Sequence, residues 1–408
     1  MYWTNFLHIY QPPTQTPEIL ERVTNECYRP LVAILLRHPH ARITLNINGC
    51  LTEQLVRDGY RDVLDGLREL AARGQIEFTA SAKYHPILPL IPEEEAIRQI
   101  ELNTEINRRY LGNVYQPQGF FSPEMCYSRA VAEMVHRLGY RWIIVDEISY
   151  CGKLGAVRYD RLYRIRGLQD LYVFFRDRST SAGITYGSFP TGETLLRRLG
   201  AAVGQKRYLL TGTDGEVYGH HRRGQEQLLI DIFASEALDL CRLTDLFTLF
   251  QEEEEVDPLP CCWSTWEDEM AAAIPYPQWA YPGHMLHDNQ WALTRLAIDA
   301  VASVDQSAPG YEAARQYLDE GLHSCQYWWA SCRPWWDTGM VERVAALLKQ
   351  AVEAITPQLS PELVCRAAFL EEEIRKTARA WQESGKARAR RRQYLETHRG
   401  VRSLLTFG

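Results

Sequence analysis

Two carboxylates in the sequence have the surroundings that acid–base chemistry requires. Glu124 ends the segment GFFSPE, so its carboxyl group is expected near the apolar end of a strand. Asp214 lies in the segment TDGE, where Gly215 permits a tight turn. Two carboxyl groups that face one site are the minimum apparatus for cleaving a glycosidic bond: one attacks or stabilises the sugar centre and the other protonates the leaving oxygen. The spacing leaves one alternative open, in which one carboxyl group caps a helix and the other lies in a surface turn.

Other polar and aromatic side chains follow the predicted strands. In parallel β/α domains the working residues lie just past the carboxyl ends of the strands. The candidates for substrate binding at these positions are His8, Asn48, His85, Asp177, Glu216 and Trp266. Connecting loops are polar in any protein, so an ordinary set of surface loops is the competing interpretation.

An aromatic tract near residue 330 is a further candidate for sugar binding. His323 precedes a run that contains Trp328, Trp329, Trp335 and Trp336. Flat indole rings make good platforms for sugars, and binding sites commonly form where two domains meet. Core packing between this helix and the β/α domain explains the tract equally well.

Signatures of other enzyme classes are missing from the sequence. It contains no GxxxxGK[ST], no GxGxxG after a strand, no HExxH and no GxSxG. The pair His220–His221 is interpreted as one site residue and one surface residue, and the pair Cys261–Cys262 as small core residues. We therefore expect neither a metal nor another cofactor.

The pattern of the chain predicts how these residues are positioned. Short apolar segments alternate with helical periodicity over the first two thirds, which favours a parallel sheet, either in a barrel or in an open doubly wound form. Strands are expected at 2–7, 42–47, 75–80, 118–122, 140–145, 162–165, 171–175, 207–213 and 261–266. Helices are expected at 17–37, 50–73, 93–110, 130–138 and 225–233.

Only helical patterns follow residue 285. An apolar stripe runs over 363–381, and Ser360 followed by Pro361 is a good signal for the start of that helix. We therefore predict a β/α domain over residues 1–270 and a helical domain over 271–408. The acidic run 252–255 is predicted to be a solvated turn or helix end, and the basic run 386–392 a solvated helix face.

The composition is that of a globular protein. The chain has 408 residues, a net charge of −7 and 46% hydrophobic residues, which excludes a disordered or fibrous protein. Its mild acidity argues against a nucleic-acid partner, and its longest apolar run, 31–36, is too short for a membrane helix. The ten cysteines form no CxxC, and the first residues carry no signal peptide pattern. These features favour a cytoplasmic protein with reduced cysteines.

Five separated segments together resemble motifs of glycoside hydrolase family 57, which acts on α-glucans, and they occur in the family's order. The five segments are 6–12 (FLHIYQP), 74–90 (GQIEF to YHPILPL), 119–124 (GFFSPE), 213–219 (TDGEVYG) and 323–331 (HSCQYWWAS). The third motif of the family ends in the nucleophilic glutamate, here Glu124. The fourth contains the acid/base aspartate, here Asp214. One such motif would be a weak signal, whereas five in order are specific.

The resemblance implies a fold and a mechanism. The fold would be an incomplete (β/α)7 barrel followed by a C-terminal α-helical bundle. The mechanism would be retaining and metal-free, with Glu124 attacking the anomeric carbon and Asp214 protonating the departing oxygen. His8, Gln11 and His85 would bind sugar hydroxyls. The implied substrate is maltodextrin, starch or glycogen, cut as by an amylase or amylopullulanase, or else rearranged as by a 4-α-glucanotransferase or branching enzyme.

The sequence also departs from the family pattern. Many members have a second histidine where this chain has Tyr10, Trp-Leu where it has Phe121–Ser122, and several have glutamate where it has His85. These departures leave the substrate and the choice between water and sugar as acceptor open. The remaining alternatives are a metal-dependent sugar enzyme similar to an α-mannosidase or a polysaccharide deacetylase, and a non-catalytic glucan-binding protein. The oligomeric state is not predicted.

Overall fold

The strands form two sheets rather than one. The structure is a computed structural model that describes residues 1–397. The first sheet has the order β3-β2-β1-β8, with β9 paired to β1, and all of its pairs are parallel. The second has the order β10-β6-β7-β5-β4, with one antiparallel pair, β6–β7. The strands are β1 (Tyr2–Ile9), β2 (Ile43–Ile47), β3 (Ile76–Phe78), β4 (Gly119–Phe121), β5 (Trp142–Asp146), β6 (Leu162–Ile165), β7 (Tyr172–Arg176), β8 (Tyr208–Asp214), β9 (Asp239–Leu240) and β10 (Glu253–Val256).

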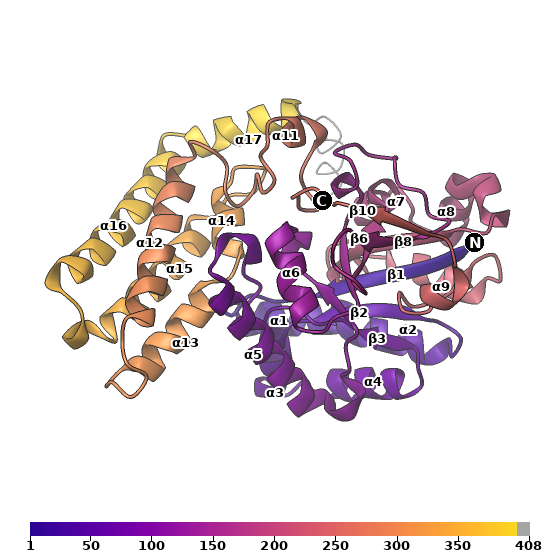
Figure 1. Cartoon of the computed structure of the whole chain (residues 1–408), viewed down its shortest axis with the longest axis horizontal. Helices are drawn as coiled ribbons and strands as arrows, with labels where there is room; N and C mark the ends of the chain where they lie inside the picture. The colour runs from indigo at the N-terminus through magenta and orange to yellow at the C-terminus, as the bar shows by residue number, and fades with distance from the viewer. Residues whose placement is uncertain (398–408) are drawn as a thin grey trace.

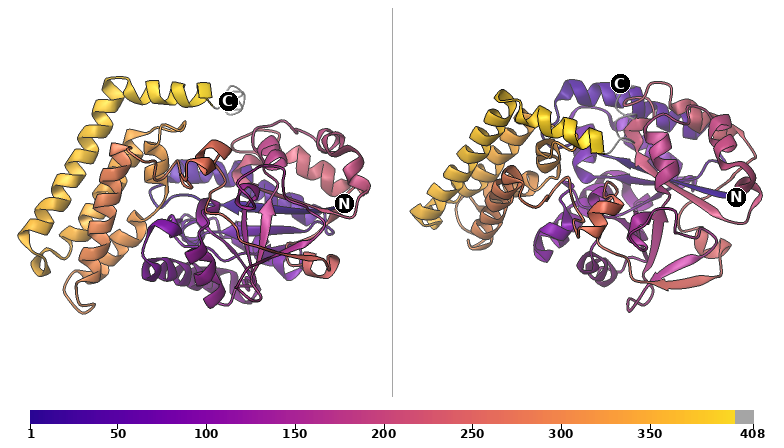
Figure 2. Two further views of the ribbon diagram at one scale, coloured as in Figure 1. Left: turned by 45° about the horizontal axis from the view of Figure 1, so that its top comes forward. Right: turned by 90° about the horizontal axis from the view of Figure 1, so that it is seen from above.

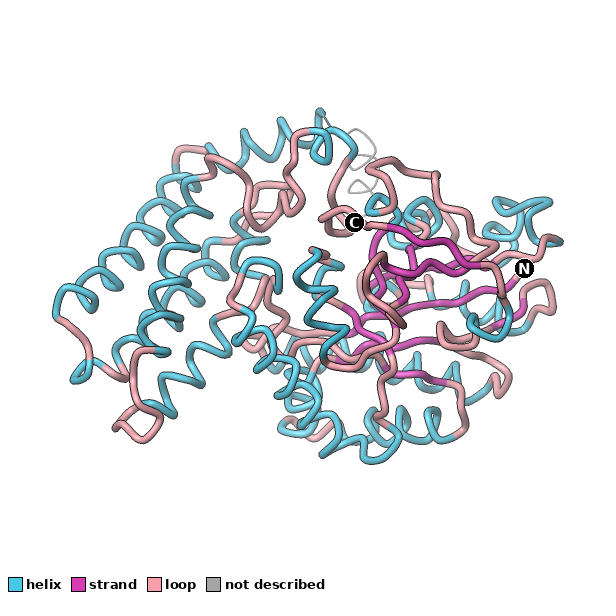
Figure 3. The backbone as a smooth tube through the Cα atoms, in the orientation of Figure 1, coloured by secondary structure: helices cyan, strands magenta, loops and turns pink. Residues whose placement is uncertain are grey.

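The two sheets approach each other on both sides. Past β3, the Ala80 amide donates to the Gly119 carbonyl at 2.9 Å, and the Phe121 amide donates to the Ala80 carbonyl at 2.9 Å. The Asp177 amide after β7 donates to the Leu210 carbonyl of β8 at 2.8 Å. The strand pairings do not close into one sheet, so the expected incomplete (β/α)7 barrel is not confirmed. The observed architecture is an α/β fold with mixed sheets and a helical C-terminal region (Figure 3).

Helices cover the sheets over the first two thirds of the chain, and a separate helical group follows (Figure 1). Around the sheets lie α1 (Pro17–Val23), a π-helical turn (Thr24–Tyr28), α2 (Arg29–Arg37), α3 (Gly49–Arg57), α4 (Arg61–Ala72), α5 (Glu93–Leu111), α6 (Arg129–Arg137), α7 (Arg178–Thr185), α8 (Gly192–Leu199), α9 (Glu226–Ala234), α10 (Leu246–Leu249) and α11 (Glu267–Ala271). The helical group comprises α12 (Met285–Ala302), α13 (Tyr311–Gly321), α14 (Cys325–Ala330), α15 (Thr338–Glu353), α16 (Pro361–Glu383) and α17 (Lys386–Thr397). Of the helices within residues 1–397, none combines the length and apolar composition that a membrane crossing needs.

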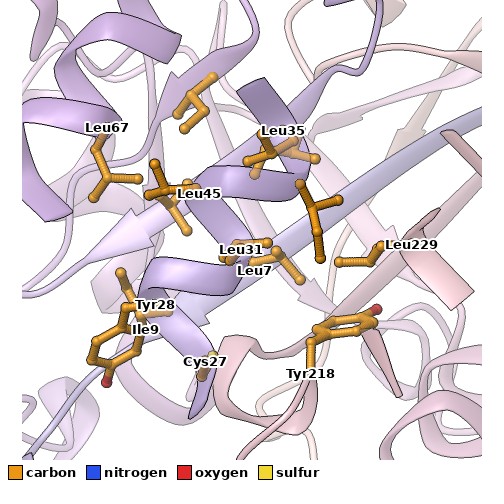
Figure 4. Packing of buried hydrophobic residues seen from close by; sticks show 14 of the residues in the cluster. Leu7, Ile9, Cys27, Tyr28, Leu31, Leu35, Leu45, Leu67, Tyr218 and Leu229 are labelled. Atoms are coloured by element: carbon orange, nitrogen blue, oxygen red, sulfur yellow. The ribbon is translucent and has the colours of Figure 1, made fainter. Parts of the chain in front are cut away.

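The core of the first sheet shows why β1 and β2 are strongly apolar. Leu7 of β1 and Leu45 of β2 are fully buried against Leu31 and Leu35 of α2 (Figure 4). Helices pack on the sheet, so the strand side chains are withdrawn from water. Burying one leucine side chain contributes about 1.5–3 kcal/mol. This packing fixes the position of the carboxyl end of β1, where His8 lies.

The helix expected at 50–73 is two helices, so that prediction was wrong in its extent. The first, α3, ends at Arg57, and α4 begins at Arg61. Between them Gly59 has φ +85°, a left-handed conformation that ends a helix and that glycine adopts without steric cost. The two helices pack on the sheet in different directions as a result (Figure 1).

Two predictions near residue 260 were also wrong. The acidic run 252–255 is largely the strand β10, which pairs in parallel with β6 at the edge of the second sheet. An edge strand tolerates the consecutive glutamates of this run because one side of it faces water. The segment 261–266 is not a strand: Cys261 forms one isolated bridge with Tyr127, and the chain then turns.

The helical group packs against the α/β part through two ion pairs, of which Arg315–Glu95 is buried and Arg98–Asp319 is partly exposed. Arg315 of α13 donates to Glu95 of α5 at 2.8 Å, and Arg98 of α5 contacts Asp319 of α13 at 2.7 Å. These pairs bring the loop that follows α13 next to the sheets. In Figure 2, α17 runs back from the end of α16 toward the α/β part. The predicted start of α16 is confirmed, since the Ser360 hydroxyl caps it. Residues 398–408 of the predicted helical domain lie outside the described residues.

Candidate active site

Glu124 lies in a turn with unusual backbone conformations. It follows β4, and both Glu124 (φ +60°) and Met125 (φ +51°) adopt left-handed conformations. The Met125 amide donates to the Ser122 carbonyl at 2.8 Å, and the Cys126 amide donates to the Pro123 carbonyl at 3.0 Å. Non-glycine residues in this region store strain, which occurs most often at functional sites. The turn thus directs the Glu124 side chain at a cost in stability.

Three side chains surround the Glu124 carboxylate. The Trp263 indole donates to Oε2 at 2.8 Å, and the Ser324 hydroxyl forms a second hydrogen bond. The Nδ1 atom of His85 lies 3.7 Å from Oε1. Burial and the charge of Asp214 raise the pKa of Glu124 well above its usual range, whereas the bonds from Trp263 and Ser324 lower that pKa. The side chain remains 15% exposed, so solvent can reach it.

Asp214 ends β8 beside the end of β1. Its Cα pairs with that of His8, and His8 pairs in turn with Asn46 of β2. Burial raises the pKa of Asp214 to about 6, and the positive charge of Arg176 opposes the increase. The charge of Asp214 also raises the pKa of Glu124, so the two carboxyl groups are electrostatically coupled and titrate as a pair. Such a pair retains one proton at a pH where an isolated carboxyl group has lost its own.

Stacked rings line the same face. The rings of Tyr10 and His85 stack at 4.4 Å, and those of His8 and His85 at 4.8 Å. The Nδ1 atom of His8 pairs with the Asn46 amide oxygen at 2.8 Å. Burial lowers the pKa of His8 to about 4 and holds that of His85 well below its usual value. Both imidazoles are therefore neutral and can donate to or accept from a sugar hydroxyl.

Glu216 belongs to a buried network beside the pair. Its Oε1 atom accepts from the Tyr28 hydroxyl at 2.5 Å, the Tyr10 amide at 3.2 Å and the Gln11 side chain at 3.4 Å. Tyr28 reaches this position from the π-helical turn after α1, a rare element that is common at functional sites. Burial and Asp214 raise the pKa of Glu216 to about 8. The Gln11 side chain is held in this network by Tyr28 and Glu216.

Two of the predicted binding residues make structural contacts instead. The Asn48 side chain donates to the Ala82 carbonyl and so holds the segment after β3. The Asp177 side chain caps α7 by accepting from the Thr180 amide at 2.8 Å. Both positions follow strands, but polar residues there also serve as caps and braces. The structure does not place either side chain in contact with Glu124 or Asp214 in the part of the chain that it describes.

The aromatic candidates divide between the junction and the bundle. Trp266 donates to the Tyr394 hydroxyl of α17 at 3.4 Å and so contacts the end of the helical group. Trp328 stacks on Trp335 at 4.5 Å and meets Trp329 edge-on at 4.8 Å. Both Trp328 and Trp329 are half-buried, so part of each ring is accessible.

His323 is fully buried beneath this aromatic tract. Burial lowers its pKa to about 3, so the imidazole is neutral. Its neighbour Ser324, rather than His323 itself, contacts the candidate site: the Ser324 hydroxyl lies 3.0 Å from His85 Nδ1, and its amide donates to the His85 carbonyl at 3.1 Å.

Three residues of the site were not selected from the sequence. Trp263 holds Glu124, Ser324 bonds both Glu124 and His85, and Arg176 lowers the pKa of Asp214. The strand-end rule and the family resemblance could have indicated all three. Arg176 ends β7, Trp263 follows the bridge at Cys261, and Ser324 lies in the fifth motif-like segment. The sequence alone could not show which neighbour in each segment faces the carboxylates.

Comparison with known proteins identifies relatives of this site and fold. Residues 4–257 match glycosyl hydrolase family 57. The α-amylase 1 of Dictyoglomus thermophilum is 28% identical over 151 residues, which is 37% of this chain and 21% of that protein. The 4-α-glucanotransferase of Thermococcus kodakarensis is 31% identical over 153 residues, 37% of this chain and 23% of that protein. The matched region spans about a fifth of the length of these relatives.

A solved structure resembles nearly the whole chain. The GH57 branching enzyme of Thermococcus kodakaraensis superposes with a TM-score of 0.66 at 16% sequence identity. The superposition covers 92% of this chain and 95% of that one. At this identity the likeness shows that the fold is shared, including the helical region that lies beyond residue 257.

Proposed function

The chain belongs to glycosyl hydrolase family 57, and we propose that it is a retaining enzyme of α-glucans in which Glu124 is the nucleophile and Asp214 the acid/base. One observation carries the proposal: the Glu124 carboxylate, in its strained turn, accepts from Trp263 at 2.8 Å, and the charge of the half-buried Asp214 raises the pKa of Glu124. Retention requires two carboxyl groups about 5–5.5 Å apart, close enough for such coupling.

The proposed reaction has two steps. In the first, a Glu124 oxygen attacks the anomeric carbon while Asp214 gives its proton to the departing glycosidic oxygen, which leaves a glycosyl-enzyme ester and an ionised Asp214. In the second, Asp214 takes a proton from water or from an acceptor sugar hydroxyl, and that oxygen attacks the anomeric carbon and releases Glu124. A pKa of about 6 lets Asp214 hold a proton for the first step and lose it afterwards near neutral pH. Burial raises the pKa of Glu124 as well, and the hydrogen bonds from Trp263 and Ser324 oppose that increase by favouring the ionised form that attacks.

The surrounding residues support a sugar substrate. The neutral rings of His8 and His85 offer hydrogen bonds to hydroxyls without a fixed charge. The half-buried Trp328 and Trp329 offer flat faces at the junction with the helical region. We therefore propose that residues 1–270 form the catalytic domain, that the contacts through Ala80 and Asp177 draw its sheets toward an incomplete barrel, and that residues 271–408 complete the substrate site.

Hydrolysis by an amylase-type activity is the first proposal, and transfer to a second glucan is the alternative. The relatives support both, because they include an α-amylase, a 4-α-glucanotransferase and a branching enzyme. The same two carboxyl groups serve all three reactions. The outcome depends on how well the site excludes water from the glycosyl-enzyme.

Product analysis tests this proposal. The purified chain is incubated with a short maltodextrin and with a branched glucan, and products are separated by length and branching. Shorter sugars with new reducing ends support hydrolysis, whereas longer or branched products without net reducing ends support transfer. The Glu124→Ala variant should be inactive. Glu77→Gln is the matched control, because Glu77 is a half-buried carboxyl on β3 bonded to Thr44, and this variant should stay active. Substantial activity of Glu124→Ala would overturn the assignment.

A further inference from the structure

Two buried cysteines flank the Glu124 turn. Cys126 lies two residues after Glu124, and Cys262 immediately precedes Trp263, whose indole binds Glu124. Both thiols are free and buried. The reaction proposed above uses neither of them, so their place beside the nucleophile calls for a separate explanation.

The backbone sets these two cysteines directly opposite each other. The Tyr127 amide donates to the Cys261 carbonyl at 2.8 Å, and the Cys261 amide donates to the Tyr127 carbonyl at 3.3 Å, which defines an antiparallel hydrogen-bonded pair. Cys126 and Cys262 are the next residues toward Glu124, where the regular pairing ends because the Trp263 amide donates to the Glu124 carbonyl at 3.2 Å. A hydrogen bond between their thiols keeps the two sulfur atoms side by side. Disulfides form between cysteines that face each other at such short range, with Cα separations of about 4.4–6.8 Å.

The side-chain contacts favour reaction at Cys262. The Cys126 thiol donates to the Cys262 sulfur, which also lies 3.0 Å from Thr265 Oγ1 and 3.3 Å from Ser264 Oγ. Hydrogen bonds to the Cys262 sulfur, that from Cys126 first, lower the pKa of Cys262 although the residue is buried, whereas burial raises the pKa of Cys126. A cysteine whose pKa is lowered, next to one whose pKa is raised, is the arrangement in which one sulfur reacts first and the second resolves the product.

We propose that Cys126 and Cys262 form a reversible disulfide when the protein meets a small peroxide, and that this bond disables the site. The Cys262 thiolate attacks one peroxide oxygen, the O–O bond breaks, and with one proton water leaves and a sulfenic acid remains. The Cys126 sulfur then attacks the Cys262 sulfur, forming the S–S bond and releasing a second water. In sum, two thiols lose two electrons and two protons to hydrogen peroxide, which becomes two waters. A dithiol reverses the step by exchange.

The disulfide would displace Glu124 because one of the two segments that it joins contains this residue and the other contacts it. A covalent S–S bond is shorter than a contact between two thiols, so the segments at Cys126 and Cys262 must move together. Glu124 lies on one segment and Trp263 on the other, and the Trp263 amide also donates to the Glu124 carbonyl at 3.2 Å. A displacement of about 1 Å at a catalytic group costs about 100-fold in rate. We therefore expect oxidised protein to lose about 100-fold in turnover.

The experiment measures the Cys126–Cys262 disulfide and the turnover of α-glucans separately. The full chain is treated with hydrogen peroxide, blocked with N-ethylmaleimide in denaturant, and analysed by intact mass and peptide mapping. We expect two fewer maleimide adducts, one peptide crosslinked through Cys126 and Cys262, and about 100-fold lower turnover that dithiothreitol restores. Cys126→Ala should turn over normally when reduced and resist peroxide. Cys365→Ala, which removes an exposed thiol, is the matched control and should remain sensitive.

The inhibitory effect of the disulfide rests on the proposed function, and the results test the disulfide and that function separately. Peroxide treatment that modifies the exposed Cys151 and Cys365 without the Cys126–Cys262 crosslink overturns the inference. A crosslinked protein with full turnover overturns the inhibitory effect. If the reduced protein has no activity on α-glucans, the proposed function fails, and the crosslink is still decided by mass alone. Cys262→Ala replaces Cys126→Ala if the latter does not fold.

Discussion

Replacing Trp263 by phenylalanine removes one hydrogen bond from the nucleophile and little else. The indole N–H donates to Glu124 Oε2 at 2.8 Å, and this bond favours the ionised carboxylate. The phenyl ring keeps the contacts that the indole face makes, including the Arg176 guanidinium 5.5 Å from the ring centroid. The change therefore isolates the effect of a single donor on the protonation of Glu124.

The magnitude follows from the strength of such a bond. A hydrogen bond to a charged group contributes about 1.5–3 kcal/mol, and 1.36 kcal/mol corresponds to about one pKa unit. Loss of the donor disfavours the charged form, so the pKa of Glu124 rises, by about 1–2. Glu124 must be ionised to attack, so the acid limb of the kcat/KM profile moves to higher pH by the same amount. At a fixed pH on that limb, kcat/KM falls about 10- to 100-fold.

The assay is the pH profile of kcat/KM for a nitrophenyl maltooligoside, with thermal unfolding as a check on the fold. Trp266→Phe is the matched control: its indole donates to Tyr394 rather than to Glu124, so the acid limb should not move. An acid limb that is unchanged in Trp263→Phe, or that moves to lower pH, would refute the role given to this bond. A shift of equal size in Trp266→Phe would show a general effect on the site.

Three further outcomes are expected. Asp214→Asn should lose about 100-fold or more in kcat/KM on maltodextrin but keep the first step on a glycosyl fluoride, whose leaving group needs no proton; equal losses on both substrates would contradict its acid role. Ser324→Ala should lower kcat about tenfold by freeing Glu124 and His85, with partial recovery in Ser324→Thr, and an unchanged kcat would count against it. Burial raises the pKa of Glu216 from 4.5 to about 8, so the folded state binds the extra proton and stability falls as pH rises through this range. Glu216→Gln should remove that fall, of order 4 kcal/mol, in unfolding curves measured between pH 4.5 and pH 8, and parallel curves would refute it.

Periodicity predicted most elements of the chain because those elements are regular. The strand β1 and the helix α16 appear where an apolar run and a capped apolar stripe predict them. The errors occur where one residue decides the outcome. Gly59 divides one helical pattern into α3 and α4, and the acidic run that forms β10 is a strand only because β6 lies beside it. Pairing of this kind depends on distant segments and leaves no local signal.

The candidate site was predictable to the level of segments. Glu124, Asp214, His8 and His85 lie together, as the strand-end rule and the family resemblance indicate. The rule is ambiguous for Asp177, because a carboxylate after a strand can also cap the next helix, as Asp177 caps α7. Within one segment, whether a residue faces the carboxylates depends on the direction of its side chain. The backbone conformation sets that direction, and the sequence does not show it.

The same limit applies to contacts between distant segments. Ser324 reaches the site only because the ion pairs of Arg315 with Glu95 and of Arg98 with Asp319 bring the helical region against α5. The residues that make these pairs are more than two hundred positions apart in the chain. Spacing and periodicity carry no information at that separation.

The most direct test is to trap the glycosyl-enzyme. Asp214→Asn is mixed with maltosyl fluoride, which needs no acid for the first step, and the second step is slow because the base that activates water is missing. Intact mass should show one added maltosyl group, and peptide mapping should place it on Glu124. The double variant with Glu124→Ala should show none. Consumption of the fluoride without an adduct, or an adduct on another residue, would contradict the assignment of Glu124 as the nucleophile.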